Sequence, residues 1–451
     1  MILEKAVIIK ERNKDNRKII IYCNDYFYSI LGILGGICAE CVVVPASPAY
    51  GEKNLQYIMK KLQDFFVVTD DEKMVTNISG DEVIFIKDGT ELKENSACNI
   101  ERINWKRSNR EDSTQFILFT SGSTDYAKGV ILSTHNVLSN ISKYEEYLPL
   151  NENDVTLIWR PICHAAVLFR EVIYSLLRGC NLVLFNERYI PQRILGYLKK
   201  YHCTYLGITP TLLRILIKFS KEREMKYLKY VTVSGERVRV DDLRTMKLQY
   251  PELKIFNVYG LTEATLQLTY LDEYWIDIKE NSVGKPLKGY EIKIVDDRGE
   301  KLNYGLKGEV IAKCESMMSG YYEDDIRTNK KIVDGWLHTG DIGYLDKEGF
   351  LYIVGRIDTM IIRSGVNIFP EEIEKVLLDS HIVQDILVYG CDDVNFGQKI
   401  CVDCVLNNEN ITLSDFKGHC REVLPAHMQP DEINLVKEIC HTANGKTRRY
   451  S

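Results

Sequence analysis

The sequence predicts an α/β fold with a large N-terminal domain of mixed and parallel sheets flanked by helices. Strand-like and helix-like stretches alternate through about the first 350 residues, which favours a mostly parallel sheet. After residue 284 the strands become shorter and are separated by turns, which indicates a β-rich subdomain. A chain of 451 residues is also too long for one ordinary core. We therefore expect a large domain over residues 1–355 and a small α+β domain over residues 356–451.

The expected strands of the large domain are short apolar runs. They occupy residues 19–22, 42–44, 65–68, 83–86, 116–119, 182–185, 205–208 and 231–233. The uncharged stretch over residues 26–39 predicts a buried helix, and further helices are expected over residues 55–62, 190–200 and 211–218. In the β-rich subdomain we expect strands over residues 291–295, 308–313 and 350–355. The small domain is expected to contain helices over residues 371–379 and 413–424 and strands over residues 386–389 and 400–406.

Composition and charge exclude several classes of protein. The chain is 45% hydrophobic and 27% charged, as is typical of a globular, soluble protein. Its formal net charge of −6 disfavours sequence-independent binding of nucleic acid. The first residues, M-I-L-E-K-A-V, lack the apolar core of a secretory signal, and the uncharged stretch over residues 26–39 is too short to span a bilayer. We therefore expect a cytoplasmic protein without a membrane span.

The 13 cysteines, in a chain without a secretory signal, indicate reduced thiols. Two C-x-x-C pairs occur, Cys38 with Cys41 and Cys401 with Cys404. Four thiolates could in principle bind zinc. Both pairs, however, lie in apolar runs rather than in the turns that zinc sites prefer. We expect buried structural thiols, because free cysteine is a common core residue.

A loop rich in small and hydroxylated residues is the first functional signal. Residues 119–130 have the sequence F-T-S-G-S-T-D-Y-A-K-G-V and follow a predicted strand. Such a loop offers backbone N–H groups, hydroxyls and the cation of Lys128 to an anion with several oxygens, such as a triphosphate. It is not the common nucleotide loop G-x-x-x-x-G-K-[ST], because Ala127 stands where glycine is required. The residues of this candidate cradle are Thr120, Ser121, Gly122, Ser123 and Thr124.

Four further segments occur with this loop in a fixed order. They are N-V-Y-G-L-T-E over 257–263, W-L-H-T-G-D over 336–341, G-R-I-D over 355–358 and N-G-K over 444–446. With them the chain resembles the adenylate-forming enzymes, a superfamily of acyl- and aryl-CoA synthetases, peptide-synthetase adenylation domains and firefly-type luciferases. The resemblance runs from about residue 5 to the last residue. Compared with full-length relatives the chain begins late, so we expect a trimmed N-terminal part.

The resemblance implies a site for ATP and Mg²⁺. In the family, the loop over residues 120–124 and Lys128 hold the β- and γ-phosphates. Glu263 matches the magnesium-binding glutamate, and Thr262 matches a hydroxyl that contacts phosphate. A carboxylate is a poor electrophile, so its activation requires charge neutralisation at the phosphates.

The resemblance also assigns the residues that hold the nucleoside and the reacting carboxylate. Tyr259 matches the aromatic residue that stacks on adenine, and Asp341 and Arg356 match the pair that holds the ribose hydroxyls. Lys446 matches the C-terminal lysine that bridges the carboxylate and the α-phosphate. Asp358 falls on the family's hinge, about which a mobile small domain reorients between the two reactions.

The acid-binding pocket is implied by a different segment. Residues 161–166, P-I-C-H-A-A, resemble the P-x-x-H segment of acyl- and aryl-CoA synthetases, and His164 is a candidate for the carboxylate pocket. This segment lacks the aspartate that would pair with an α-amino group. By analogy the pocket is lined by Val167, Leu168, Phe169, Gly207, Ile208, Gly235 and Glu236. Most of these residues are apolar, which fits an aliphatic or aromatic acid.

The resulting hypothesis is an AMP-forming acid–thiol ligase. It forms an acyl-adenylate with release of pyrophosphate and then transfers the acyl group to a thiol, for which CoA is the first expectation. Residues 363–374, R-S-G-V-N-I-F-P-E-E-I-E, resemble the small-domain face of CoA ligases, and relatives that load a phosphopantetheine carrier protein share it. A carrier protein is therefore the alternative acceptor. A non-catalytic nucleotide-binding descendant is the second alternative, since Asp125 stands where the family usually has glycine.

Overall fold

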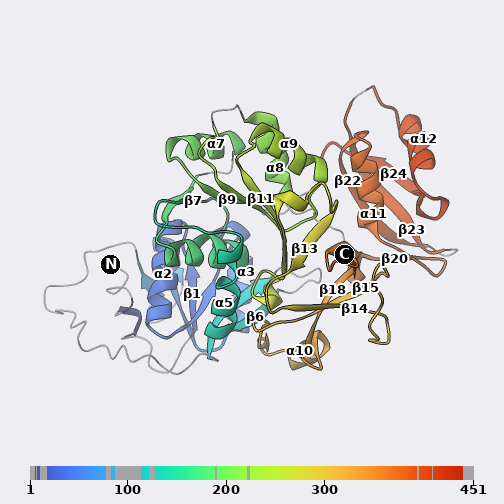
Figure 1. Cartoon of the computed structure of the whole chain (residues 1–451). Coiled ribbons are helices and arrows are strands. Elements are labelled where there is room, and N and C mark those ends of the chain that lie inside the picture. Colours follow the sequence, from blue (N-terminus) through green and yellow to red (C-terminus); the bar gives the residue numbers. More distant parts are fainter. Residues whose placement is uncertain are drawn as a thin grey trace, which may run out of the picture.

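The computed structural model describes residues 6, 8–10, 18–77, 83–86, 113–120, 127–187, 190–220, 224–393, 396–408 and 410–439. Two large sheets and one smaller sheet, flanked by helices, confirm the predicted α/β fold (Figure 1). All eight strands predicted for the first part of the large domain are present, and their ends differ from the prediction by at most two residues. The apolar stretch over residues 26–39 forms the predicted helix.

The first sheet has seven strands in the order β16-β6-β5-β2-β1-β3-β4. Strands β1 to β5 pair in parallel, whereas β6 pairs antiparallel with both β5 and β16. The strands are β1 (Lys18–Tyr22), β2 (Val42–Pro45), β3 (Phe65–Thr69), β4 (Val83–Phe85), β5 (Thr114–Thr120), β6 (Lys128–Ser133) and β16 (Gly320–Tyr321). The associated helices are α2 (Tyr26–Cys38), α3 (Glu52–Lys61), α4 (Glu72–Asn77) and α5 (Thr134–Ile141).

The second sheet has twelve strands, and it joins the parallel part of the large domain to the predicted β-rich subdomain. Its parallel half contains β7 (Val155–Ile158), β8 (Asn181–Leu184), β9 (Tyr205–Ile208), β10 (Tyr230–Val233) and β11 (Lys254–Tyr259). Its antiparallel half contains β12 (Thr269–Leu271), β13 (Ser282–Pro286), β14 (Glu291–Val295), β15 (Gly308–Lys313), β17 (Ile332–Val333), β18 (Trp336–Leu345) and β19 (Leu351–Arg356). The reversal occurs where β11 pairs with β12, so the two halves share one hydrogen-bonded sheet.

Helices cover both faces of the parallel half. Helices α7 (Pro191–Lys200), α8 (Pro210–Phe219) and α9 (Val240–Gln249) pack their apolar residues against one face (Figure 1). A π-helical segment, η5 (Ala166–Tyr174), continues into α6 (Ser175–Leu177) and contacts β7, β9 and α5 on the other side. Helix α10 (Asp325–Lys331) lies in the chain between β16 and β17.

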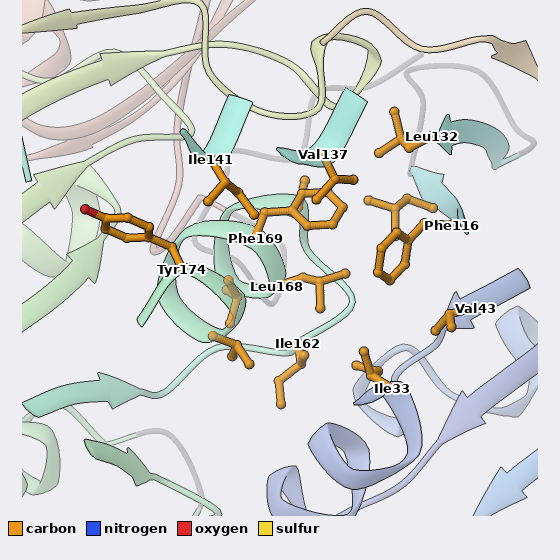
Figure 2. Close-up of a cluster of buried hydrophobic side chains, with 14 of the residues drawn as sticks. Ile33, Val43, Phe116, Leu132, Val137, Ile141, Ile162, Leu168, Phe169 and Tyr174 are labelled. Atoms are coloured by element: carbon orange, nitrogen blue, oxygen red, sulfur yellow. The ribbon is translucent and has the colours of Figure 1, made fainter. Parts of the chain in front are cut away.

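The main hydrophobic core lies between the first sheet and the η5 segment (Figure 2). Phe116 of β5 and Phe169 of η5 meet edge to face, with ring centroids 5.3 Å apart. Burying one side chain of this size contributes roughly 1.5–3 kcal/mol. The prediction that Val167, Leu168 and Phe169 line an acyl pocket is wrong in this structure, because all three are fully buried in this core.

The C-terminal part of the chain forms a third sheet with its own core (Figure 1). The strands are β20 (Ile361–Arg363), β21 (Val366–Ile368), β22 (Val383–Asp393), β23 (Gly397–Leu406) and β24 (Glu432–Leu435), with helices α11 (Pro370–Asp379) and α12 (Leu413–Val423). It contacts the rest of the molecule through polar side chains: Lys307 Nζ lies 2.6 Å from Glu372 Oε1, and Arg239 Nη2 lies 3.1 Å from His381 Nδ1.

Three of the four cysteines in the C-x-x-C pairs lie in a helix or strand, and Cys41 lies directly before β2. Cys38 ends α2 and is half-buried, whereas Cys41, Cys401 and Cys404 are buried. Within the described ranges, no group of three or more histidine, cysteine, aspartate and glutamate side chains could hold a metal ion. In the same ranges, no helix is both long and apolar enough to cross a membrane.

Candidate active site

Tyr259, Asp341 and Arg356 form the centre of the candidate site. Tyr259 ends β11, and Asp341 of β18 is the register partner of Arg356 of β19. The Tyr259 hydroxyl donates to Asp341 Oδ2 at 2.5 Å, and Arg356 Nη1 donates to Asp341 Oδ1 at 2.9 Å. The antiparallel register therefore fixes a carboxylate between a phenol and a guanidinium group.

The electrostatics of this group follow from burial. Burial raises the pKa of Asp341, while Arg356 and the Tyr259 hydroxyl act in the opposite direction. Burial, followed by the charge of Asp341, raises the pKa of Tyr259 well above its ordinary value. The phenol therefore remains a hydrogen-bond donor at neutral pH.

The segment that carries Thr262 and Glu263 forms a tight 3-10 turn, η6 (Thr262–Ala264), directly after β11. Gly260 begins this connection, and a side chain there would overlap the carbonyl oxygen of Leu266. Glu263 is held by one oxygen, since the Tyr321 hydroxyl donates to Oε1 at 2.7 Å. Within the described part of the chain, Glu263 Oε2 receives no hydrogen bond. A single half-buried carboxylate of this kind suits Mg²⁺, which usually takes one or two carboxylates together with substrate phosphates.

The phosphate loop connects to this turn at its base. Thr120 ends β5 and Lys128 begins β6, and the two are register partners across the antiparallel pair. Lys128 Nζ lies 5.7 Å from the centroid of the Tyr321 ring, whose hydroxyl binds Glu263. The structure thus brings the base of the loop next to the turn. Ser121, Gly122, Ser123 and Thr124, together with Asp125 and Lys446, lie outside the described residues.

The residues predicted for the acid pocket have fewer contacts that connect them to the rest of the candidate site. His164 precedes η5, and its Nε2 lies 2.5 Å from the Tyr50 hydroxyl. Gly235 is exposed with φ of 102°, and Glu236 beside it is half-buried. Asp358, at the predicted hinge, accepts a hydrogen bond from Arg356 Nε at 3.0 Å.

A buried charged cluster was missed by sequence reasoning. Arg160 and Glu171 form an ion pair whose side chains are 7% and 0% exposed. Their neighbour Arg170 is fully buried and donates to the Tyr205 hydroxyl, the Ser234 hydroxyl and the Gln267 side chain. The only signal in the sequence was the presence of charged residues inside an apolar run.

This cluster changes the surroundings of Gly207. A side chain at position 207 would overlap the Glu171 carboxylate and approach Arg160 Nη2 to 3.2 Å. Trp159 Nε1 donates to the Gly207 carbonyl at 2.8 Å. A carboxylate and a guanidinium group therefore lie against the Gly207 backbone, so the surroundings of this predicted lining residue are charged.

Comparison with known families gives two matches to this chain. The model of the AMP-binding enzyme family matches residues 9–322, and the model of the AMP-binding enzyme C-terminal domain matches residues 372–446.

Curated relatives match most of the chain. The chain is 29% identical over 340 residues to a 2-succinylbenzoate–CoA ligase of Enterococcus faecalis, covering 75% of this chain and 69% of that protein. It is 30% identical over 347 residues to an oxalate–CoA ligase of Arabidopsis thaliana, covering 76% of this chain and 67% of that protein. A long-chain-fatty-acid–CoA ligase of Escherichia coli O6:H1 is 31% identical over 343 residues, with 74% of this chain and 60% of that protein covered.

Solved structures share the fold over nearly the whole chain. The o-succinylbenzoate CoA synthetase of Bacillus subtilis, in complex with its acyl-adenylate intermediate, has a TM-score of 0.85 at 22% identity, covering 99% of this chain and 90% of that one. ATP-bound MatB from Rhodopseudomonas palustris has a TM-score of 0.87 at 21% identity, covering 99% and 91%.

Proposed function

The chain belongs to the AMP-binding enzyme family, and on this basis we propose that it is an AMP-forming acid–CoA ligase. The observation that carries the proposal is the arrangement of Tyr259, Asp341 and Arg356 beside Glu263 and the base of the Lys128 loop. It presents an aromatic ring, a carboxylate and cations to one ligand. These groups suit the base, ribose and phosphates of ATP.

The proposed reaction has two steps. In the first, an oxygen of the substrate carboxylate attacks the α-phosphorus of ATP, and the bond to the bridging oxygen of pyrophosphate breaks. In the second, the CoA sulfur attacks the acyl carbon, the bond to AMP breaks, and the thiol proton is released. A magnesium ion held at Glu263 would supply positive charge to the phosphates.

The residues of the chain have distinct parts in this scheme. Asp341 accepts hydrogen bonds from the ribose hydroxyls, and Arg356 and Tyr259 hold its carboxylate in position. Lys128 and the loop over residues 120–124 bind the β- and γ-phosphates. Lys446 reaches the reacting carboxylate and the α-phosphate, where a compact ammonium group suits the crowded in-line geometry.

The acid is the open part of the proposal, because the curated relatives are named for very different acids. The first experiment is therefore pyrophosphate release from ATP and Mg²⁺ with a panel of carboxylic acids, run without acceptor, with CoA and with a phosphopantetheine carrier protein. We expect acid-dependent release and a CoA thioester. Folded protein that binds ATP but releases no pyrophosphate with any acid would contradict the proposal, and thioester formation on the carrier alone would replace CoA by the alternative acceptor.

A variant at Lys446 tests the division between the two steps. Lys446→Ala should lower the rate of adenylate formation by at least roughly 100-fold, because it removes a cation from the charge-separating step. Thioester formation from supplied acyl-AMP should remain within a few-fold of wild type. Equal loss of both steps, measured by AMP release and by CoA consumption, would be incompatible with the part assigned to Lys446.

A further inference from the structure

Lys331 reaches the candidate nucleotide site from outside the recognised segments. It is the last residue of α10, and its Nζ donates to the carbonyl oxygen of Thr339 at 2.8 Å. Thr339 lies two residues before Asp341 on β18, and its hydroxyl accepts a hydrogen bond from the Asp341 N–H at 3.0 Å. The ammonium group is therefore anchored next to the carboxylate assigned to the ribose.

Lys331 and Arg356 flank a position that has no side chain. Gly340 has φ of 77°, and a Cβ atom placed there would lie 3.5 Å from Arg356 Nη2 and 3.7 Å from Lys331 Nζ. Apart from Gly340 itself and its two chain neighbours, no other atom of the described residues approaches this point within 4 Å. The two cations thus border a small open space above the Gly340 backbone.

The neighbouring carboxylates are already engaged by other groups. Glu263 accepts from Tyr321, and Asp341 accepts from Tyr259 and Arg356. Glu309 faces His338 through one oxygen and the Gly340 N–H through the other. Among the described residues, none of these carboxylates lies within ion-pair distance of Lys331, and the Thr339 carbonyl is the one hydrogen-bond acceptor of its ammonium group.

Lys331 is half-buried, and its ammonium group donates to a single neutral acceptor, so its hydrogen-bonding capacity is not filled. Burial lowers the pKa of Lys331, and the charges of Glu263 and Asp341 oppose this effect. Lysine has three N–H donors, so two remain for a ligand. A phosphate group carries several strong acceptor oxygens and negative charge, which match these donors and the adjacent guanidinium group.

We propose that Lys331 is a phosphate-binding residue of the nucleotide site, which together with Arg356 holds the phosphate chain of ATP above Gly340. The inference rests on the proposed function, because it takes the nucleoside to be held at Tyr259 and Asp341. Lys331 binds the non-bridging oxygens and neutralises part of their charge. It thus adds a cation that the five recognised segments do not contain.

The test is a binding experiment on the full chain. Dissociation constants for Mg-ATP, AMP and adenosine are measured by calorimetry for the wild type, Lys331→Met, Lys331→Arg and the control Lys330→Met. Lys330 precedes Lys331 on α10 and is exposed, so it matches the charge change without the contact. We expect Lys331→Met to weaken Mg-ATP binding by roughly tenfold or more, to leave adenosine binding within about twofold, and to be rescued largely by Lys331→Arg.

Each other result overturns the inference. An equal loss of ATP and adenosine binding would show that Lys331 only supports the fold, and an unchanged ATP affinity would show that it does not meet phosphate. The same loss of ATP affinity in Lys330→Met would show that any positive charge in this part of α10 has the effect, without contact to phosphate. A wild-type chain that does not bind ATP would contradict the inference directly. Failure of the proposed function is distinguishable, because it appears as absent pyrophosphate release while the ATP affinities still separate Lys331→Met from wild type.

Discussion

Removal of the Arg160 guanidinium group should destabilise the large domain strongly. Arg160→Met keeps most of the side-chain volume but leaves the Glu171 carboxylate, which is 0% exposed, without its ion-pair partner. Loss of one partner from a buried pair costs about 3–5 kcal/mol, because a buried charge remains uncompensated. Arg170 also acts on Glu171 in the same direction as Arg160, so we expect a value near the lower end, about 3–4 kcal/mol.

The assay is thermal unfolding followed by circular dichroism at several pH values. At roughly 2 °C per kcal/mol for a protein of this size, Tm should fall by about 6–8 °C at pH 7. Arg193→Met is the matched control, because Arg193 pairs with Glu187 on the surface, with side chains 53% and 39% exposed, and such pairs contribute about 0–1 kcal/mol.

The pH dependence has a definite sign. Burial raises the pKa of Glu171 despite the opposing charge of Arg160, and loss of Arg160 raises it further. When the pKa of a carboxyl group is higher in the folded state than in the unfolded state, the protein loses stability as the pH rises from the unfolded-state pKa to the folded-state pKa. The deficit of Arg160→Met relative to wild type should therefore be largest near neutral pH and shrink as the pH falls and Glu171 binds a proton.

A double variant provides the refutation. In Arg160→Met/Glu171→Leu both charges are absent, and we expect most of the lost stability to return, because apolar replacement of a buried pair is often close to neutral. The reasoning fails if Arg160→Met lowers the free energy of unfolding no more than Arg193→Met does. It also fails if the double variant loses as much free energy of unfolding as Arg160→Met and Glu171→Leu lose together as single variants.

Two further predictions concern the site and the thiols. Tyr259→Phe removes the hydroxyl that donates to Asp341 and should lower the free energy of unfolding by about 1.5–3 kcal/mol at pH 7 in urea titrations, and by less as the pH falls and the Asp341 carboxyl binds a proton; a loss that does not change with pH would contradict the charge-assisted bond. Burial raises the pKa of Cys163 and of Cys203 to about 12, so both native thiols should react with Ellman's reagent at pH 8 at least roughly tenfold more slowly than after denaturation, as followed by mass spectrometry of labelled peptides. Rapid labelling of either in the native state would show that its thiolate is accessible.

The order of the motifs was sufficient to identify the family. The chain contains five short segments, from the loop after residue 119 to N-G-K over 444–446. Each segment contains donors, acceptors or cations that binding of ATP and a carboxylate requires, so the segments could be recognised without a structure. Apolar runs were likewise sufficient for the strands, since local periodicity carries that information. The prediction for the acid pocket depended on analogy alone. It assigned Val167, Leu168 and Phe169 to the pocket wall, whereas these residues lie in the hydrophobic core.

The sequence by itself thus determined the α/β fold, the family and the types of side chain that the chemistry needs. Only the tertiary structure decided which distant charges meet: Arg160 with Glu171 against Gly207, and Lys331 with Arg356 across Gly340. The physical reason is that strand register and helix packing set these distances. A residue at the end of α10 has no local feature that reveals a carbonyl of β18 as its partner. Charged residues at such positions resemble solvated surface residues until the fold removes them from water.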